Sequence, residues 1–442
     1  MLKITQYSSD IFSQMYLKAM LPEDHILLRI KRFVDFSFIV QETADLYSDI
    51  GRGSIDPERM FKLLFLMYFE NIPSERELAE QVRVNVLYRY FADINLDESV
   101  PDHSSFTVFR ERLGKHRFKK IFQRIVEQCI QHNLIDGKHI SFDNTLFKAN
   151  AALPKKKEPE QVKKDLEKLI ERTFDEESKN SSQKKDPIVS KTDPDAGLVT
   201  RPNKGTMFAY SMHIGCDSKE KIITSVEVTS GTTKGEAVII DQVKEQKEKY
   251  NLPVEKVSAD SEYNDGEVRN ELEKMKVTPY IPIRKSFQKK RPGMFSHEQF
   301  IYNKKKDRVI CPNKKVMSYR GLTSDGKARI YQAKNKDCLF CPVKQKCTKA
   351  KIHPRSIQIS VYEESMVRAR ILNKSPGYRE AQSIRKTTTE PKFSEAKRYH
   401  GLNRARYRGL EKVTIQALLI AICINVKRMV TLLFPQLGLG FT

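Results

Sequence analysis

Three features that the chain lacks limit the class of protein it can belong to. No uninterrupted apolar run reaches the ~18 residues typical of a membrane-spanning helix, so we expect no segment to cross a bilayer. The N-terminal stretch MLKITQYSSDIF has no apolar core of the kind found in secretory signal peptides. The 7 cysteines are odd in number and unevenly spread, which excludes a disulfide framework and fits a reducing cytoplasm.

Acidic residues are scarce relative to basic ones. The sequence holds 79 Lys+Arg against 56 Asp+Glu, which gives a formal net charge of +23. So large a charge favours a polyanionic partner, either nucleic acid or an acidic membrane surface. Charge alone leaves open a basic soluble protein without such a partner. The 442 residues are enough for two or three domains and a sizeable core.

Residues 1–115 have the signals of an all-helical N-terminal domain. Asp56-Pro57 and Ser74 with Glu77 are typical helix starts, the second of them a capping box. The segments 74–91 and 104–118 are short and basic, as in a helix-turn-helix, so we expect this domain to contact DNA. The alternative is a plain helical bundle with a solvated charged face.

The middle of the chain alternates strand and helix patterns, which predicts an α/β domain over residues 116–442. The order is strand, hairpin, helix, strand, helix, strand, so the domain is expected to hold a mixed five-stranded sheet with flanking helices. A charged stretch at about 153–200 reads as a flexible insert, with an exposed helix at 158–173 and disorder at 176–195. The predicted strands cover residues 139–142, 209–216, 222–229, 256–259 and 278–283.

Two aspartates, Asp143 and Asp260, each come directly after a predicted strand. If the first and fourth strands are neighbours, these carboxylates meet at one end of the sheet. A divalent cation would offset the desolvation of such a pair, because hard ions take oxygen ligands. The alternative for Asp143 is that it only starts a turn.

Residues 285–360 form a second basic, irregular insert, and the chain is helical again from 363 to 434. Leu418, Leu419, Ile422 and Val426 recur at helical spacing and should pack on the sheet. The insert contains four cysteines whose number and loop-rich setting suit one structural Zn²⁺. The alternative is reduced thiols. The four are Cys311, Cys338, Cys341 and Cys347, whereas Cys129, Cys216 and Cys423 lie in apolar sequence and are expected to be buried.

Motifs along nearly the whole chain resemble those of DDE transposases of bacterial insertion sequences. The resemblance is to the subgroup with an N-terminal helical domain and a cysteine-bearing insert before the last catalytic glutamate. The matching residues are Ser54–Pro57 with Met60–Lys62, Ser74–Leu78, Pro101–Ser104, Asp143, Ala259–Tyr263, Tyr280–Pro282, and Glu390, Phe393, Lys397 and Arg408–Lys412.

The resemblance implies a ribonuclease-H-like fold in which Asp143, Asp260 and Glu390 bind two Mg²⁺ or Mn²⁺ ions. It also implies double-stranded DNA as partner, namely terminal inverted repeats and target DNA, a homodimer in the DNA complex, no membrane, and a bacterial, nucleoid-associated location in the cytoplasm. The implied activity is metal-dependent cleavage at element ends followed by strand transfer. The alternatives are a DNA nuclease that does not join ends and an inactive, transposase-derived DNA-binding protein.

The surroundings of the last acid depart from the related pattern. Lys397 stands seven after Glu390 as expected, but Lys386 replaces an arginine four before it and Ser383 replaces a tyrosine seven before it. Glu395 is the competing acid, although Phe393 has the family's spacing only to Glu390. Lys397 is expected to bind a DNA phosphate. Three arginines that follow, Arg404, Arg406 and Arg408, are candidates for further backbone contacts, or else lie on a solvated helix face.

Overall fold

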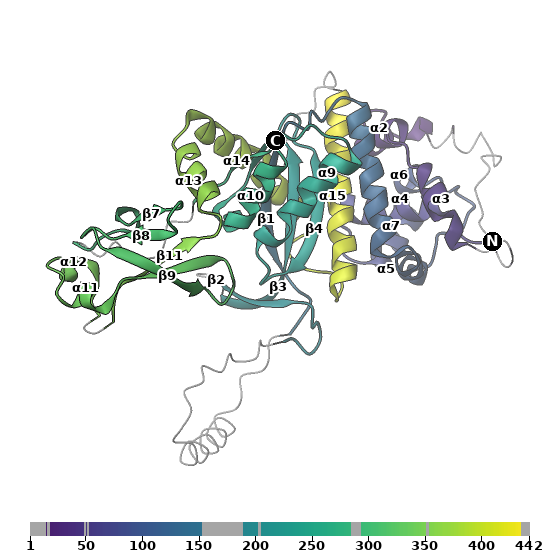
Figure 1. Ribbon diagram of the computed structural model, residues 1–442. Coiled ribbons are helices and arrows are strands. Elements are labelled where there is room, and N and C mark those ends of the chain that lie inside the picture. The colour runs from purple at the N-terminus through teal and green to yellow at the C-terminus, as the bar shows by residue number, and fades with distance from the viewer. Residues whose placement is uncertain are drawn as a thin grey trace, which may run out of the picture.

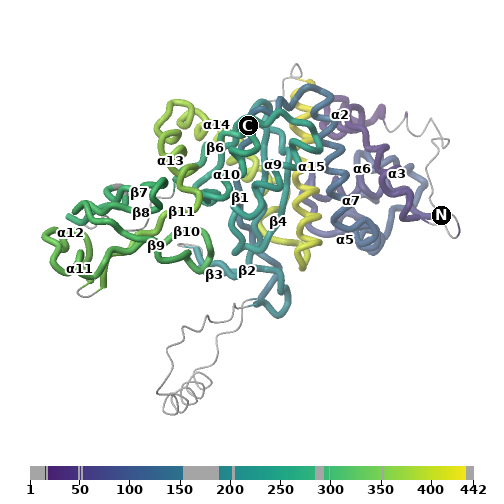
Figure 2. Tube along the Cα trace, in the orientation of Figure 1, coloured from purple at the N-terminus to yellow at the C-terminus, as the bar shows by residue number. Residues whose placement is uncertain are grey.

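The computed structural model describes residues 15, 18–47, 50, 53–152, 189–201, 205–283, 293–350 and 353–434. Three regions lie side by side (Figure 1): a helical N-terminal part, a central sheet, and a small second sheet at the far end from the N-terminus. The tube in Figure 2 shows that the chain returns from the second sheet to the central one through its last helices. Most of the predicted charged insert, residues 153–188, lies outside the described residues.

The central sheet is mixed, as predicted, but has six strands. Its order is β2-β3-β1-β5-β6, and β4 pairs with β3 beside β2. The parallel pairs β1–β5 and β5–β6 follow crossover connections, whereas β3 and β4 form the predicted antiparallel hairpin. The strands are β1 (His139–Lys148), β2 (Gly197–Arg201), β3 (Gly205–Asp217), β4 (Ile223–Ser230), β5 (Lys256–Ser258) and β6 (Thr278–Tyr280).

The strand that the sequence did not predict, β2, lies at the end of the stretch interpreted as a charged insert. It pairs with the start of β3, which is longer than expected. The residues before it are also ordered, because the buried Asp193 accepts a hydrogen bond of 2.6 Å from the hydroxyl of Tyr210. The prediction of disorder up to residue 195 is therefore wrong for its described part, residues 189–195.

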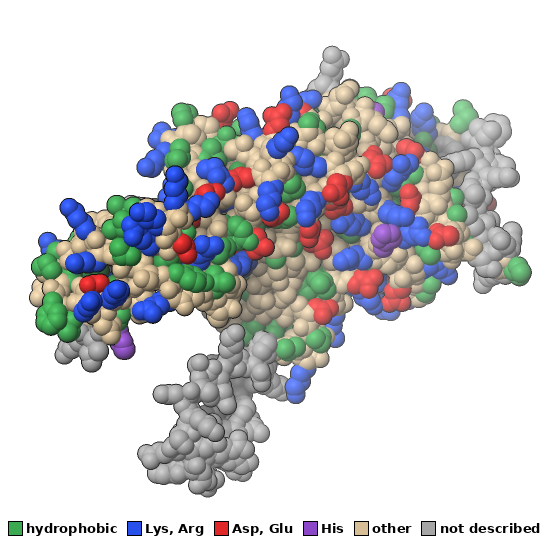
Figure 3. Space-filling model, viewed as in Figure 1, with side chains coloured by type: hydrophobic (Ala, Val, Ile, Leu, Met, Phe, Trp, Pro, Cys, Tyr) green, Lys and Arg blue, Asp and Glu red, His purple; other side chains and the backbone are tan. Residues whose placement is uncertain are grey.

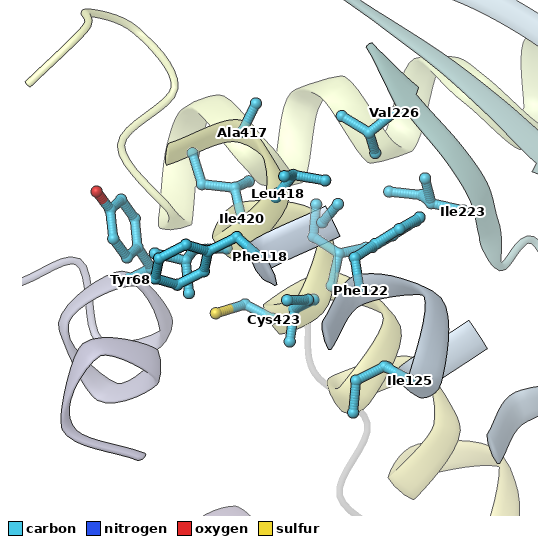
Figure 4. Packing of buried hydrophobic residues seen from close by; sticks show 14 of the residues in the cluster. Tyr68, Phe118, Phe122, Ile125, Ile223, Val226, Ala417, Leu418, Ile420 and Cys423 are labelled. Atoms are coloured by element: carbon cyan, nitrogen blue, oxygen red, sulfur yellow. The ribbon is translucent and has the colours of Figure 1, made fainter. Parts of the chain in front are cut away.

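Helix α15 (Leu410–Leu433) is the centre of the hydrophobic core. It packs against β4 on one side and against α7 (His103–Gln131) on the other. Figure 4 shows Leu418 and Ile420 of this helix among Phe118, Phe122 and Ile223. The four apolar positions predicted to face the sheet are all buried. The helix is long and apolar enough to cross a membrane, but 89% of its most apolar window is buried inside the protein.

The N-terminal helices belong to the same core. They are α2 (Ile26–Phe33), α3 (Phe38–Thr43), η1 (Ala44–Leu46), α4 (Pro57–Phe69), α5 (Glu75–Val84) and α6 (Val86–Phe91). The predicted starts are confirmed: the Asp56 carboxylate accepts from the Glu58 amide at 2.8 Å, and the Ser74 hydroxyl from the Glu77 amide at 3.1 Å. One continuous apolar cluster joins these helices to α15 and the sheet.

Helix α7 runs across the predicted domain boundary at residue 115. It kinks at Gly114, whose φ of 59° is in the left-handed region that favours glycine. Some of the basic side chains of this helix form contacts within the protein. The buried Arg110 pairs with Glu75 and donates to the Tyr407 hydroxyl at 2.9 Å. The contact between Arg110 and Tyr407 joins residues on either side of position 115, and so does the apolar core. The domain boundary at 115 stays a prediction.

Residues 293–360, named here the cysteine module, are not irregular as predicted but form a second sheet. Its strand order is β11-β10-β9-β8-β7, all antiparallel. Short strands with few apolar residues gave no clear alternation, which is why the sequence pattern missed them. The module contains η4 (His297–Gln299), β7 (Ile301–Asn303), β8 (Arg308–Ile310), β9 (Val316–Leu322), β10 (Ala328–Gln332), α11 (Asn335–Leu339), α12 (Lys344–Cys347) and β11 (Ser356–Ser360).

The remaining helices flank the central sheet. Two of them, α9 (Ile239–Lys249) and α10 (Gly266–Lys274), belong to the connections that lead to β5 and β6, with short turns η2 (Gly235–Ala237) and η3 (Ser261–Tyr263). After the cysteine module, α13 (Glu363–Leu372) packs on α10. Helix α14 (Pro376–Tyr399) then crosses β1, β5 and β6 and brings the C-terminal residues to the sheet.

Candidate active site

Asp143 lies within β1 and not after its end, which corrects the sequence prediction. The parallel pairing of β1 with β5 ends at Ser141 opposite Ser258, but β1 continues to Lys148 because it pairs with the long β3. Asp143 is therefore two residues beyond the last parallel pair. Asp260 is likewise two residues beyond Ser258, so both aspartates lie at the same end of the parallel strands, as predicted.

The Asp143 carboxylate is mostly buried and is held by α14. Its Oδ2 accepts from Arg385 Nη1 at 2.6 Å and from Thr389 Oγ1 at 2.9 Å, and its Oδ1 accepts from the Asn144 amide at 2.9 Å. Burial raises the pKa of Asp143, the Arg385 guanidinium opposes that shift, and the charge of Asp260 adds to it. The structure thus places a desolvated carboxylate next to a second one, with one guanidinium as counter-charge.

Asp260 begins the turn that follows β5. Its Oδ1 accepts from the Glu262 amide at 2.8 Å and caps η3. Tyr263 of this turn is fully buried and packs so tightly on Gly235 that a Cβ there would lie 2.4 Å from the ring. Only glycine fits at that position, so the packing fixes where the turn, and with it Asp260, lies beside β1.

Glu390 is on α14, the helix that holds Asp143. Two hydrogen bonds from Gln382 Nε2, to the Ala259 carbonyl at 3.1 Å and the Tyr280 carbonyl at 2.7 Å, fix the helix across the strand ends. Thr389 faces Asp143, whereas Glu390, the next residue, is exposed. Within the described residues no three His, Cys, Asp or Glu side chains lie close enough to hold a metal ion. The structure thus brings Asp143 and Asp260 together and leaves Glu390 one helix position away.

The competing acid, Glu395, is committed elsewhere. Its carboxylate lies 3.0 Å from Lys427 of α15. Burial opposes its charge, but a hydrogen bond with His400 and the Lys427 ammonium hold its pKa at about 2. Glu395 therefore joins α14 to α15 through Lys427.

The basic residues after Glu390 have different roles. Lys397 Nζ donates to Thr145 Oγ1 at 2.6 Å, which places its charge two residues along β1 from Asp143. Arg404 and Arg408 are exposed and bond Asn150, just past the end of β1. Arg406 donates to the Ile72 carbonyl at 2.7 Å and lies over the Tyr68 ring. Arg406 thus joins the N-terminal helices to this loop, and its role as a DNA contact stays a prediction.

Arg385 and Thr389 are site residues that sequence reasoning missed. The family pattern expects an arginine four residues before Glu390, where this chain has Lys386, and the Lys386 side chain is exposed. The signal that could have found them is the buried face of α14. Its buried residues recur at helical spacing and include both, with Ala381, Thr388, Lys392 and Ala396.

Replacing Arg385 should change metal binding and stability together. In Arg385→Gln the metal-free protein leaves the Asp143 carboxylate buried without its counter-charge, a loss of about 3–5 kcal/mol for a buried pair. We expect a lower melting temperature without metal, and partial recovery plus several-fold tighter Mn²⁺ binding at pH 8. Calorimetric titration and thermal melts measure both. The control is Lys386→Gln, and equal melting and Mn²⁺ affinity in the two variants would contradict the competition between Arg385 and metal.

The four clustered cysteines come together at one end of the module. They line a single cavity, Cys311 from the β8–β9 turn and the others from α11 and α12 and the segment between them. Burial raises the pKa of Cys347, and the other three thiols raise it further. The three remaining cysteines are buried as predicted, and burial raises the pKa of Cys129 and Cys216 to about 12.

Comparisons with known proteins identify the family. Residues 15–112 match a transposase domain (DUF772), residues 128–336 match a transposase DDE domain, and residues 310–430 match a second transposase DDE domain model. No curated protein matches the sequence.

Similar solved structures are transposase complexes. The piggyBac transposase synaptic complex with hairpin DNA is 14% identical with a TM-score of 0.38, over 94% of this chain and 77% of that chain. The Mos1 transposase paired-end complex with left transposon end is 14% identical with a TM-score of 0.17, over 60% of this chain and 70% of that chain. These superpositions are weak, so the assignment depends on the sequence families. Since the two DDE matches together span residues 128–430, around a mixed sheet that carries two neighbouring aspartates, the chain belongs to the DDE-type DNA transposases, enzymes with a ribonuclease-H-like fold that use divalent metal ions.

Proposed function

We propose that this transposase cleaves the ends of a mobile DNA element and transfers them to target DNA, with Asp143, Asp260 and Glu390 as ligands of two Mg²⁺ or Mn²⁺ ions. The observation that carries the proposal is the buried Asp143 carboxylate beside Asp260. Such a pair is unfavourable without positive charge, and divalent ions supply it through oxygen ligands. The carboxylates of Asp143 and Asp260 therefore suit a divalent metal ion. Glu390 is on the exposed face of α14, so its side chain would have to turn toward them to act as the third ligand.

The two ions would activate the attacking oxygen and stabilise the leaving oxygen in an in-line displacement at phosphorus. The chain's own residues orient the reaction. Asp143 and Asp260 are fixed by strand pairing and by the Tyr263 turn, and α14 is fixed by Gln382. Lys397 lies beside Thr145, where its ammonium can bind a phosphate of the strand being cut.

The partner we propose is duplex DNA, as the element's terminal inverted repeats and as target, bound by a homodimer. The net charge of +23 supports DNA affinity, and Figure 3 shows Lys and Arg side chains over much of the visible face, including the cysteine module. We also propose a location at the bacterial nucleoid, in the cytoplasm, because that is where such DNA substrates lie.

A strand-transfer assay with the purified full chain tests the function. Labelled duplexes that carry the element ends, intact or pre-cut, are incubated with plasmid target in Mg²⁺, Mn²⁺ or EDTA. We expect metal-dependent cleavage of intact ends and metal-dependent joining of pre-cut ends. Cleavage without joining would indicate the nuclease alternative, and binding with neither reaction would indicate a DNA-binding protein without activity.

We further propose that the four clustered cysteines bind one structural Zn²⁺. The module has a small core of seven buried apolar residues, and units of this size usually need a metal or disulfide for stability. Lys315, Lys344 and Arg355 line the same cavity and would offset the negative charge of four thiolates. The four sulfurs are not at metal-binding spacing in this structure, so zinc binding would require them to come closer together.

Metal content tests the zinc site. Protein purified under reducing conditions should carry about one equivalent of Zn²⁺, and the double variant Cys338→Ser/Cys341→Ser should carry almost none and lose protease resistance in the module. The control is Cys129→Ala, a buried cysteine outside the module, which should keep the metal. A wild-type protein without zinc but with a protease-resistant module would refute the site.

A further inference from the structure

The outer end of the cysteine module exposes two large apolar side chains. Leu339 ends α11 and is 55% exposed, and Phe340, the next residue, is 83% exposed. Helices α11 and α12 are at the end of the molecule furthest from the N-terminal helices (Figure 1). An exposed phenylalanine loses the free energy that its burial would give, so its position at a tip indicates a contact surface.

Lysines surround this tip. Between residues 334 and 349 the sequence has five lysines and a single acid, Asp337. The β8–β9 turn beside the cysteines adds two more. In Figure 3 the visible face at this end shows apolar side chains bordered by basic ones. The lysines are Lys314, Lys315, Lys334, Lys336, Lys344, Lys346 and Lys349, and all but the half-buried Lys344 are exposed.

The tip is held in a compact turn. The Cys341 amide donates to the Cys338 carbonyl at 3.4 Å, and the Lys344 amide donates to the Cys341 carbonyl at 3.1 Å. The first bond closes a turn that contains Phe340, and the second closes the turn that follows, so the exposed ring is carried by a compact backbone. A compact backbone turn leaves less backbone entropy to be lost when its side chains insert into a partner.

We propose that Leu339 and Phe340 form a wedge that inserts between base pairs from the minor groove of duplex DNA, while the surrounding lysines bind the flanking phosphates. Minor-groove proteins use apolar side chains, phenylalanine and leucine among them, to unstack a base step and bend the duplex. The inference rests on the proposed function only in taking DNA as the partner. It adds a contact outside the active site, on a separate sheet.

Charge and size favour DNA over a protein partner for this tip. Lysine is depleted in protein–protein interfaces, whereas its binding to DNA phosphates is favoured by the release of condensed counterions. The strongly exposed apolar part consists of two adjacent side chains, which is small against the roughly 800 Å² that each partner buries in a stable protein interface.

Binding to a short duplex with 2-aminopurine at a central step tests the wedge. The full chain is titrated without added Mg²⁺ or Mn²⁺, so that no cleavage enters the result and any zinc held by the four cysteines stays in place. Wild type should raise the 2-aminopurine fluorescence, because unstacking relieves its quenching, and should bend a duplex labelled for energy transfer. Phe340→Ala should lose both signals and about tenfold in affinity, and Phe340→Trp should restore them.

The matched control is Ile371→Ala on α13, an apolar side chain that is 68% exposed outside the module. Lys336→Gln/Lys346→Gln should reduce the slope of log affinity against log salt by about two. Phe340→Ala that unstacks and bends DNA like wild type would overturn the wedge. So would a Phe340→Ala variant whose only change is loss of self-association, which would indicate a protein contact. Failure of wild type to bind any duplex would instead refute the proposed function.

Discussion

Asp143→Asn should lower the rate of DNA cleavage on the order of 10³-fold or more and leave duplex affinity nearly unchanged. The amide keeps the shape of the side chain but removes the negative charge that would bind metal, next to the Arg385 guanidinium that is already there. Duplex affinity should persist because it depends on the basic surface, which this substitution does not touch. Single-turnover cleavage and filter binding at the same salt concentration measure the two effects separately.

The same result is expected for Asp260→Asn and Glu390→Gln. Glu380→Gln is a matched control, since Glu380 is an exposed glutamate on the same helix. If Glu390→Gln kept full activity while Glu395→Gln lost it, the assignment of Glu390 as the third metal ligand would be wrong. The structure makes that outcome unexpected, because Glu395 pairs with Lys427 and contributes to the packing of α15.

The position of the two aspartates could be predicted because parallel pairing is a strong constraint. A strand–helix–strand pattern sets β1 and β5 side by side, and the register then places Asp143 and Asp260 at one end. Arg385 could not be found in this way. Its contact with Asp143 depends on the angle at which α14 crosses the sheet, and that angle is set by Gln382 and by packing that no local pattern records.

The strands of the cysteine module could not be predicted from local sequence patterns. Its strands are three to seven residues long, and β9 alternates little, with a single buried residue, Met317. Strand pairing here depends on neighbours far along the chain, such as Ile359 opposite Arg329, so the sequence showed only basic, turn-rich residues. The cysteines were found because their spacing is local, although the sheet that brings Cys311 to them was not.

Deleting residues 1–115 should unfold the rest of the chain. If these residues were an independent DNA-binding domain, as the sequence predicted, the deletion would remove only DNA recognition. The deletion takes away α2 and α4, which pack on α15, and cuts α7 just past its kink. Each fully buried Leu, Ile or Phe contributes ~1.5–3 kcal/mol, so the loss of several such side chains exceeds the roughly 5–15 kcal/mol that stabilises a domain. Circular dichroism and thermal melts of fragment 116–442 measure this directly.

Three hydrogen bonds across residue 115 strengthen the expectation. Arg406 would lose the Ile72 carbonyl, and Tyr407 would lose Arg110 and Glu75, so two half-buried polar side chains would lose these partners in the fragment. Sequence preference is therefore better tested in the full chain, with Arg76→Ala and Arg83→Ala on the exposed face of α5. A fragment 116–442 that melts cooperatively at the temperature of the whole protein would show that the shared core contributes little, and would support residue 115 as a domain boundary.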